Sequence, residues 1–208
     1  ATEAGRRIGV TYKVLDNHDG ELMATLDVRE QIIRLIREWK ADVVVGPRPY
    51  DYHPDHRNTA ILLQDAAFMV VVPNIVSDTP ALQENPVFLY AQDRFEKPYP
   101  FIPDIAIDIS DTFEKKIYGM SAHESQYFDW LPWLSNELQD VPEDEEGRQK
   151  WLQGFRKRPI TDAVRQSLIK WYGQEKALKM TDAEAFEICE YGKQPTEEEI
   201  KALFPMLP

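Results

Sequence analysis

The sequence contains a single cysteine, Cys189, among its 208 residues. One thiol excludes an intrachain disulfide and a thiolate zinc site, and Cys189 is expected to be buried and inert. Long hydrophobic runs are also lacking, because the longest extends only from Ala66 to Val72, far short of a bilayer span. No basic and apolar signal segment opens the chain, so a cytoplasmic protein without a transmembrane segment is expected.

Positive charge is scarce as well. The sequence has 36 acidic residues against 24 lysines and arginines, which gives a net charge of −12. An acidic surface repels phosphate backbones, so nucleic acid is disfavoured as a partner. The chain also lacks an initiator methionine, and Ala1 to Arg7 is typical of the tail of a helix. We therefore expect a fragment or a processed N-terminus.

The first 46 residues are predicted to form a strand–helix–strand unit. Apolar residues alternate from Ile8 to Val14, which is typical of a strand. Thr25 is a suitable N-cap for a helix that ends near Trp39; its apolar face comprises Val28, Ile32, Leu35, Ile36 and Trp39, with Arg37 off that face. Val43 to Gly46 is a continuous apolar strand of the kind that parallel sheets bury on both faces.

The remainder of the chain predicts further strands and helices. A helix is expected from about Arg57 to the break at Pro73, and strands are expected at 87–90 and 105–109. Ser110 or Asp111 is a candidate cap for a helix that continues past His123 towards Trp130. Later segments follow in the order acidic linker (142–147), interrupted helix (151–172), edge strand around Phe186 and Ile188, and a capped helix that begins at Thr196.

These elements predict an α/β fold, a Rossmann-like and mostly parallel sheet flanked by helices, with a C-terminal helical extension. Residues 1–135 are expected to form the α/β core. Residues 136–208 are expected to form an acidic linker and a helical extension packed on that core.

The segment from Asp51 to Arg57 concentrates groups that bind a metal or move a proton. It holds two of the four histidines, His53 and His56, with Asp55 between them. Histidines at positions i and i+3 share one face if the segment enters a helix, and imidazole is a good zinc ligand. Sites in open α/β sheets form beyond the carboxyl ends of strands, which is where this segment lies. A histidine-bearing turn without a metal remains the alternative.

The segment His53-Pro54-Asp55-His56-Arg57, after the strand Asp42-Val43-Val44-Val45, resembles the second motif of the PIG-L/LmbE-like de-N-acetylases. Other segments also resemble the family, and they occur in the same order along the chain: Asp19-Gly20-Glu21-Leu22, Pro73-Asn74-Ile75, Pro80-Ala81-Leu82, Asp108-Ile109-Ser110 and His123-Glu124-Ser125-Gln126. The resemblance implies a zinc hydrolase, with another divalent metal as an alternative. The implied substrate is an N-acetylated sugar conjugate, and a homo-oligomer is left open.

The resemblance also implies roles for individual residues. His56 corresponds to the family's metal-ligand histidine, and His53 to the histidine that stabilises the oxyanion and helps in proton transfer. Asp55 is assigned a supporting catalytic role. Tyr52 and Arg57 are expected to orient substrate. His123 is expected near the same pocket as a substrate-binding residue.

The sequence departs from the family at one point. The family's first motif, His-Pro-Asp-Asp, supplies two zinc ligands and the general base, and it is absent from these residues. Its expected position is upstream of Ala1. Three hypotheses follow: a zinc-dependent de-N-acetylase of which this chain carries part of the active site, a non-catalytic carbohydrate-binding relative, or a remodelled site that uses His53, His56 and His123.

Overall fold

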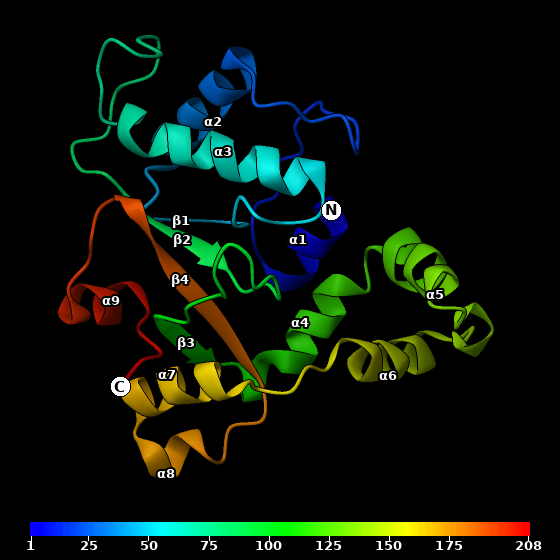
Figure 1. The fold of residues 1–208 in the computed structure, drawn as a ribbon. Helices are drawn as coiled ribbons and strands as arrows, with labels where there is room; N and C mark the ends of the chain where they lie inside the picture. Colours follow the sequence, from blue (N-terminus) through cyan, green and yellow to red (C-terminus); the bar gives the residue numbers. More distant parts are fainter. The chain divides into compact units, whose positions relative to one another are not determined.

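The computed structural model describes residues 1–208 and contains a four-stranded sheet and nine α-helices (Figure 1). The strands are β1 (Val43–Gly46), β2 (Val87–Ala91), β3 (Ile105–Asp108) and β4 (Ala183–Gly192). The α-helices are α1 (Thr2–Ile8), α2 (Leu26–Trp39), α3 (Pro54–Met69), α4 (Phe113–Met120), α5 (Leu131–Leu134), α6 (Glu145–Arg156), α7 (Asp162–Tyr172), α8 (Gln174–Ala177) and α9 (Glu197–Leu203). Shorter helical segments are η1 (Ser110–Thr112), the π-helical η2 (Ser125–Trp130) and η3 (Leu138–Asp140).

The strands follow the order β1-β2-β4-β3. β1 and β2 pair in parallel from Val43↔Val87 to Gly46↔Tyr90, whereas β4 runs antiparallel to β2. The predicted α/β fold is therefore confirmed, and β4 makes its sheet a mixed one.

The edge position predicted for Phe186 and Ile188 is wrong. Both residues belong to β4, which lies inside the sheet between β2 and β3. Ile188 pairs with Leu89, and Phe186 pairs with Ala91. An alternating pattern identifies the covered face of a strand, but it carries no information about the neighbours that bond to its two backbone edges. The C-terminal part of the chain thus supplies a sheet strand as well as helices.

The strand predicted from Ile8 to Val14 is also wrong. Ile8 ends α1, Gly9 caps that helix in the left-handed conformation, and residues 10–14 form no strand. Val10, Tyr12 and Val14 are all exposed. Alternation alone does not form a strand, because a strand also needs a neighbour that satisfies its backbone hydrogen bonds. The opening unit is therefore helix, helix, strand.

Helices α2 and α3 lie side by side next to β1 (Figure 1). The Thr25 hydroxyl accepts the Val28 N–H, which confirms the predicted cap. Ile33 and Ile36 of α2 share a core cluster with Ala66 and Val70. Burial of this apolar surface stabilises the folded state by about 25 cal/mol for each Å² removed from water.

Arg37 is buried in this core, although the helical pattern placed it on the polar face of α2. Its guanidinium donates to six carbonyl oxygens near the end of α3 and in the following loop, those of Met69, Val70, Val72, Ile75, Val76 and Thr79. Cationic groups stabilise the free carbonyls at a helix C-terminus. Arg37 therefore ends α3 and orders the loop that follows.

The chain forms two compact units. One comprises residues 17–107, 161–179 and 184–208 and contains nearly all of the sheet. The other comprises residues 1–16, 108–160 and 180–183, with a core cluster around Ile117, Phe128 and Leu152. The expected division into 1–135 and 136–208 stays a prediction. Among the helices, none combines the length and the apolar character that crossing a bilayer would need.

The cap predicted at Ser110 or Asp111 for the helix before His123 is wrong. Ser110 and Asp111 lie in η1, and α4 follows with Thr112 at its N-cap and no side-chain cap bond. The Ser110 hydroxyl instead bonds the Asp108 carboxylate. Helix α4 ends at Met120, so His123 lies in the turn before η2 rather than within one long helix.

Candidate active site

The histidine-rich turn lies where the sequence places it, between the carboxyl end of β1 and the start of α3. His53 is the N-cap of α3, and its ring Nδ1 accepts the Asp55 N–H at 3.3 Å. Pro54 follows at the first helical position, where its fixed φ suits a helix start and no N–H is missed. Residues 53–55 therefore determine both the shape of the turn and the orientation of the His53 ring.

Asp51 organises the same turn, although no role was expected for it from the sequence. Its Oδ1 accepts the His53 N–H at 2.9 Å and lies 3.0 Å from His56 Nδ1. Arg57 closes the turn from the other side by donating to the carbonyl oxygens of Asp51 and Tyr52. An aspartate two residues before a bonded N–H is a recognisable Asx turn, and this local signal would have identified Asp51.

The two histidines converge. Their ring centroids are 4.9 Å apart with a 41° angle between the planes. The side chain of His56 is about half exposed (49%). Since its Nδ1 faces Asp51, its Nε2 is the nitrogen left for a ligand, and a carboxylate on one imidazole nitrogen is the usual support for a metal on the other.

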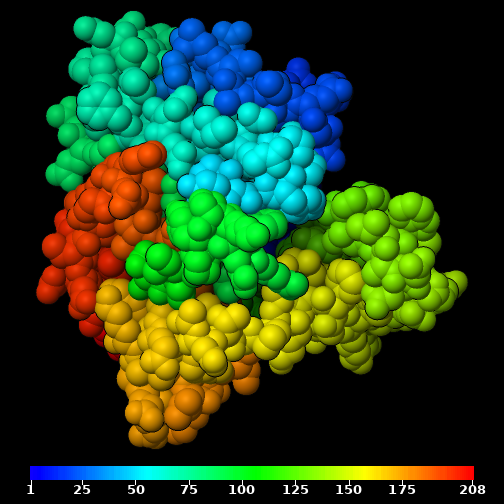
Figure 2. All heavy atoms as spheres, viewed as in Figure 1, coloured from blue at the N-terminus to red at the C-terminus, as the bar shows by residue number.

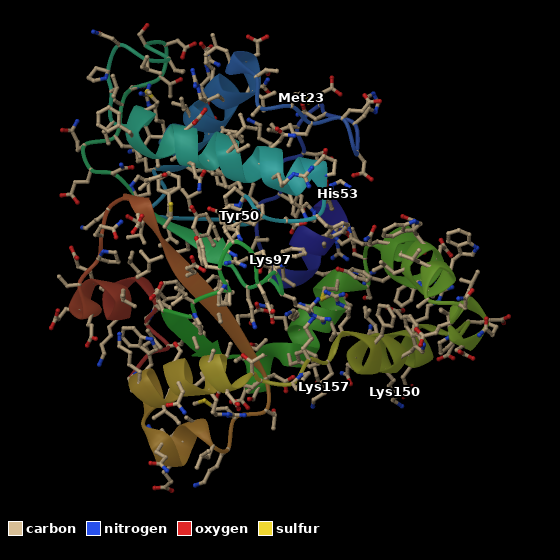
Figure 3. All side chains as sticks on the ribbon, in the orientation of Figure 1. Met23, Tyr50, His53, Lys97, Lys150 and Lys157 are labelled. Carbon is tan, nitrogen blue, oxygen red and sulfur yellow. The ribbon has the colours of Figure 1, made fainter.

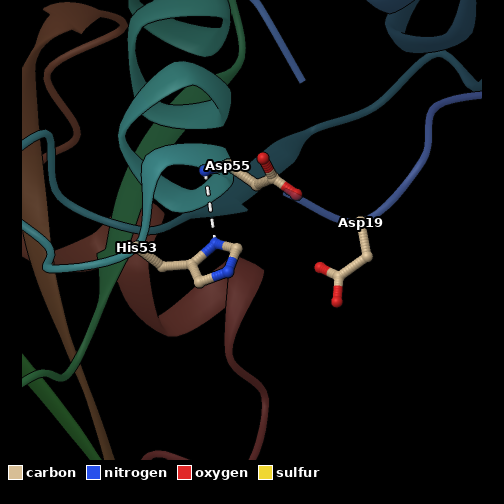
Figure 4. A group of neighbouring side chains, drawn as sticks. All are labelled: Asp19, His53 and Asp55. Atoms are coloured by element: carbon tan, nitrogen blue, oxygen red, sulfur yellow. Dashed lines mark hydrogen bonds between the residues drawn. The ribbon is translucent and has the colours of Figure 1, made fainter. Parts of the chain in front are cut away.

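Asp19 is a further member of the site. Donor atoms of Asp19, His53 and Asp55 all lie within 4.8 Å of one another (Figure 4). Asp55 holds the segment after Asp19 in place, because its carboxylate accepts the backbone N–H groups of Gly20 at 2.7 Å and Leu22 at 3.2 Å. The family-like segment Asp19–Leu22 is thereby bonded to the histidine turn, although 33 or more residues separate them along the chain.

The donor atoms at this turn include the ligand types of a metal centre. One imidazole and two carboxylates are ligands that zinc and other divalent metals accept. His56, the residue expected to bind metal, is not in this cluster of three. The group of Asp19, His53 and Asp55 therefore offers three ligands to a metal, the number that a catalytic zinc centre requires, whereas His56 Nε2 offers one.

A cavity of about 380 Å³ opens beside the turn. It lies beyond the carboxyl ends of β1 and β2, and it is lined by Val45, Gly46, Pro47, Arg48, Asp51, His56, Ala91, Gln92 and Asp93. Its size falls within the usual range for small-molecule sites. Figure 3 labels Tyr50 and His53 at the turn and Lys97 in the segment that follows β2.

The structure brings together five of the six predicted site residues: Tyr52, His53, Asp55, His56 and Arg57. Tyr52 is 69% exposed and contacts both histidines edge to face. His123 belongs to the other compact unit, where its ring lies against Tyr127 and burial lowers the pKa of its imidazole.

Part of the chain is similar to known de-N-acetylases. Residues 1–67 match the family model described as PIG-L, GlcNAc-PI de-N-acetylase. Diacetylchitobiose deacetylase of Thermococcus kodakarensis is 32% identical over 128 residues, which make up 58% of this chain and 47% of the relative. The chain therefore spans about half the length of the curated relative it matches.

Solved structures show the same fold at lower identity. N,N'-diacetylchitobiose deacetylase from Pyrococcus horikoshii has a TM-score of 0.59 at 22% identity, over 90% of this chain and 61% of that chain. GalB, the 4-carboxy-2-hydroxymuconate hydratase of Pseudomonas putida, has a TM-score of 0.60 at 13% identity, over 94% of this chain and 71% of that chain. One fold thus carries different reactions, so the function must be argued from the site. The family model and the curated relative together support a place for this chain in the PIG-L/LmbE-like de-N-acetylase family.

Proposed function

We propose that this chain carries part of the active site of a zinc-dependent hydrolase that removes the N-acetyl group from an N-acetylglucosamine-type conjugate. The observation that carries the proposal is the turn from Asp51 to Arg57, which presents His53 and His56 at the carboxyl end of β1 beside the 380 Å³ cavity. The family match over residues 1–67 and the deacetylase relative support the reaction class.

His56 is the proposed zinc ligand, through the Nε2 atom that its contact with Asp51 leaves free. Zinc with an open coordination position lowers the pKa of its water to about 7 and polarises a carbonyl oxygen. His53 lies next to His56 and is proposed to donate a hydrogen bond to the oxyanion that forms when the acetyl carbonyl is attacked. Removing one such donor typically costs about 3–4 kcal/mol of transition-state stabilisation.

The other predicted residues act around this pair. Asp55 holds the Gly20–Leu22 segment, so its proposed role is to fix the wall of the site next to His53. Arg57 fixes the carbonyl side of the turn, and Tyr52 offers an exposed ring to the substrate. His123 is kept as a proposed substrate-binding residue.

Metal analysis and acetate release together test the proposal. Protein supplied with a His-Pro-Asp-Asp segment ahead of Ala1 is expected to contain zinc and to release acetate from N,N'-diacetylchitobiose, because the segment adds the ligands that His56 alone does not provide. His56→Ala is expected to abolish both, whereas His18→Ala, in an exposed turn, is the matched control and changes neither. If protein supplied with this segment binds no zinc and releases no acetate, the proposal is contradicted.

Asp19→Asn distinguishes the two metal arrangements. If His56 holds the metal, the Asp19→Asn variant keeps it; if the Asp19, His53 and Asp55 group holds it, Asp19→Asn loses metal and His56→Ala does not. The second candidate function is a non-catalytic carbohydrate-binding relative, favoured by the position of His56 outside the cluster of three donors. Sugar binding without acetate release would support that candidate.

A further inference from the structure

Two aromatic rings from different loops flank the histidine turn. Tyr52 follows β1, and Phe95 belongs to the irregular segment between β2 and β3. Their ring centroids are 6.3 Å apart, and Tyr52 also lies 5.9 Å from the His53 ring and 6.1 Å from the His56 ring. The segment after β2 (green) lies beside the start of α3 (cyan) on the surface in Figure 2. Exposed Tyr52 and partly buried Phe95 therefore border the proposed reacting groups.

Arg48 holds in place the segment that carries Phe95. Arg48, fully buried, bonds both oxygens of the Asp93 carboxylate at 2.8 and 2.6 Å. It also donates to the carbonyl oxygens of Phe95 at 2.7 Å and Tyr99 at 3.1 Å. A bidentate arginine–carboxylate pair fixes geometry as well as contributing energy. The position of Phe95 is therefore set by the end of β1, the same strand end that sets the histidine turn.

Polar groups lie close to both residues, because Asp51 precedes Tyr52 in the chain and Asp93 accepts the Phe95 N–H. The cavity next to the turn is lined by Asp51, Gln92 and Asp93 as well as His56. Carboxylates accept hydrogen bonds, and an amide both donates and accepts. A pyranose ring has an apolar C–H face and an edge of hydroxyl groups, so its face matches an aromatic ring and its edge matches these polar side chains.

We propose that Tyr52 and Phe95 form a stacking subsite for the sugar ring attached to the N-acetylated one, so that the site prefers a disaccharide to a monosaccharide. This inference rests on the proposed function, since it takes the acetyl group to lie at His53 and His56. Tyr52 and Phe95 are specificity-determining residues in this assignment, and Arg48 and Asp93 are positioning residues.

Binding of two sugars to protein held in a metal chelator tests the subsite without any reaction. Calorimetry is expected to show tighter binding of N,N'-diacetylchitobiose than of N-acetylglucosamine. Tyr52→Ala and Phe95→Ala are each expected to weaken the disaccharide about three- to tenfold and to leave the monosaccharide unchanged. Tyr52→Phe keeps the ring and is expected to retain disaccharide affinity. Tyr191→Ala removes an exposed ring from β4 and serves as the control.

Each result has a distinct meaning. An equal loss for both sugars, or no loss in either alanine variant, overturns the subsite. If wild-type protein releases acetate but the alanine variants keep its preference for the disaccharide, the subsite fails while the proposed function stands. If protein supplied with the His-Pro-Asp-Asp segment releases no acetate but the rings still select the disaccharide, the subsite stands and the hydrolase assignment fails. A wild-type protein that binds neither sugar overturns the subsite. Circular dichroism of each variant confirms that it is folded.

Discussion

At the scale of single residues, Arg48 is held by partners from more than one segment of the chain. It is fully buried and pairs with Asp93, whose side chain is 12% exposed, and its Nη1 lies 3.7 Å from the Glu187 carboxylate. A buried ion pair yields little net stability, but removal of one partner leaves the others charged and uncompensated. Arg48 follows β1, Asp93 follows β2 and Glu187 lies within β4, so this one guanidinium connects the ends of β1 and β2 to the middle of β4.

We predict that Arg48→Met lowers the free energy of unfolding by about 3–5 kcal/mol, because Asp93 and Glu187 lose their cation. Urea denaturation measures this change. The control is Arg34→Met, which removes a partly exposed arginine paired with the exposed Asp78 and is expected to cost about 1 kcal/mol or less. Equal effects of the two substitutions would contradict the prediction.

Glu187 gives a pH-dependent prediction. Burial raises the pKa of its carboxyl above the ordinary value for glutamate. The folded state then holds the proton more tightly than the unfolded state, so the contribution of Glu187 to stability falls as the pH rises from the ordinary pKa through the raised one. Glu187→Gln does not titrate. The free energy of unfolding of the Glu187→Gln variant, minus that of wild type, is therefore expected to increase as the pH rises from the ordinary pKa to the raised one. Urea titrations made from about pH 4 upwards measure this difference. A difference that is independent of pH would contradict the assignment.

At the scale of elements, the unit formed by β1, the turn and α3 positions the candidate site. β1 is a short apolar strand in parallel with β2, and α3 starts at a proline after an N-capping histidine. The turn between them therefore has little freedom, since both its ends are fixed. β4 supports this unit from its place beside β2.

Gly192 fixes the end of β4. Its φ is +81°, and a Cβ at this position would lie 2.8 Å from the Pro86 carbonyl oxygen. We predict that Gly192→Ala destabilises the protein by about 1–3 kcal/mol, because the left-handed conformation and the backbone contact both disfavour a side chain. Gly154→Ala is the matched control: it lies within α6 with nothing near its added Cβ and is expected to stabilise by about 0.5–1 kcal/mol. Thermal unfolding of both variants measures whether each one is less or more stable than wild type. A Gly192→Ala variant that is more stable than wild type would contradict the predicted backbone strain.

At the scale of the whole molecule, each of the two compact units has its own core. Ile117, Phe128 and Leu152 form one, and the cluster around Ile33, Ala66 and Val70 belongs to the other. The fold class by itself leaves the reaction undecided, since a deacetylase and a hydratase share it.

Leu152→Ala tests the separate cores. Leu152 is fully buried, so its truncation is expected to cost about 2–5 kcal/mol through the cavity it leaves. Hydrogen exchange is expected to lose protection in α4 and α6, with little change in α2 and α3. Equal loss of protection in all four helices would show that the two cores open as one.

The sequence by itself determined the elements whose signals are local. Thr25 caps α2, Thr196 and Glu199 form the expected capping box of α9, and the apolar run at Val43 forms β1. The histidine turn belongs to this group, because Pro54 and the capping ring of His53 act within a few residues. Such signals can be predicted because a helix start or a buried run depends on neighbours in the chain.

Only the tertiary structure decided which distant segments meet. Asp19 joins His53 and Asp55, Arg48 joins Asp93 and Glu187, and β4 enters the sheet beside β2. The exposed stretch from Val10 to Val14 shows the converse, since it has the pattern of a strand and no partner. Periodicity reports which face of a segment is buried, whereas the partner of a carboxylate or a strand edge depends on the path of the whole chain.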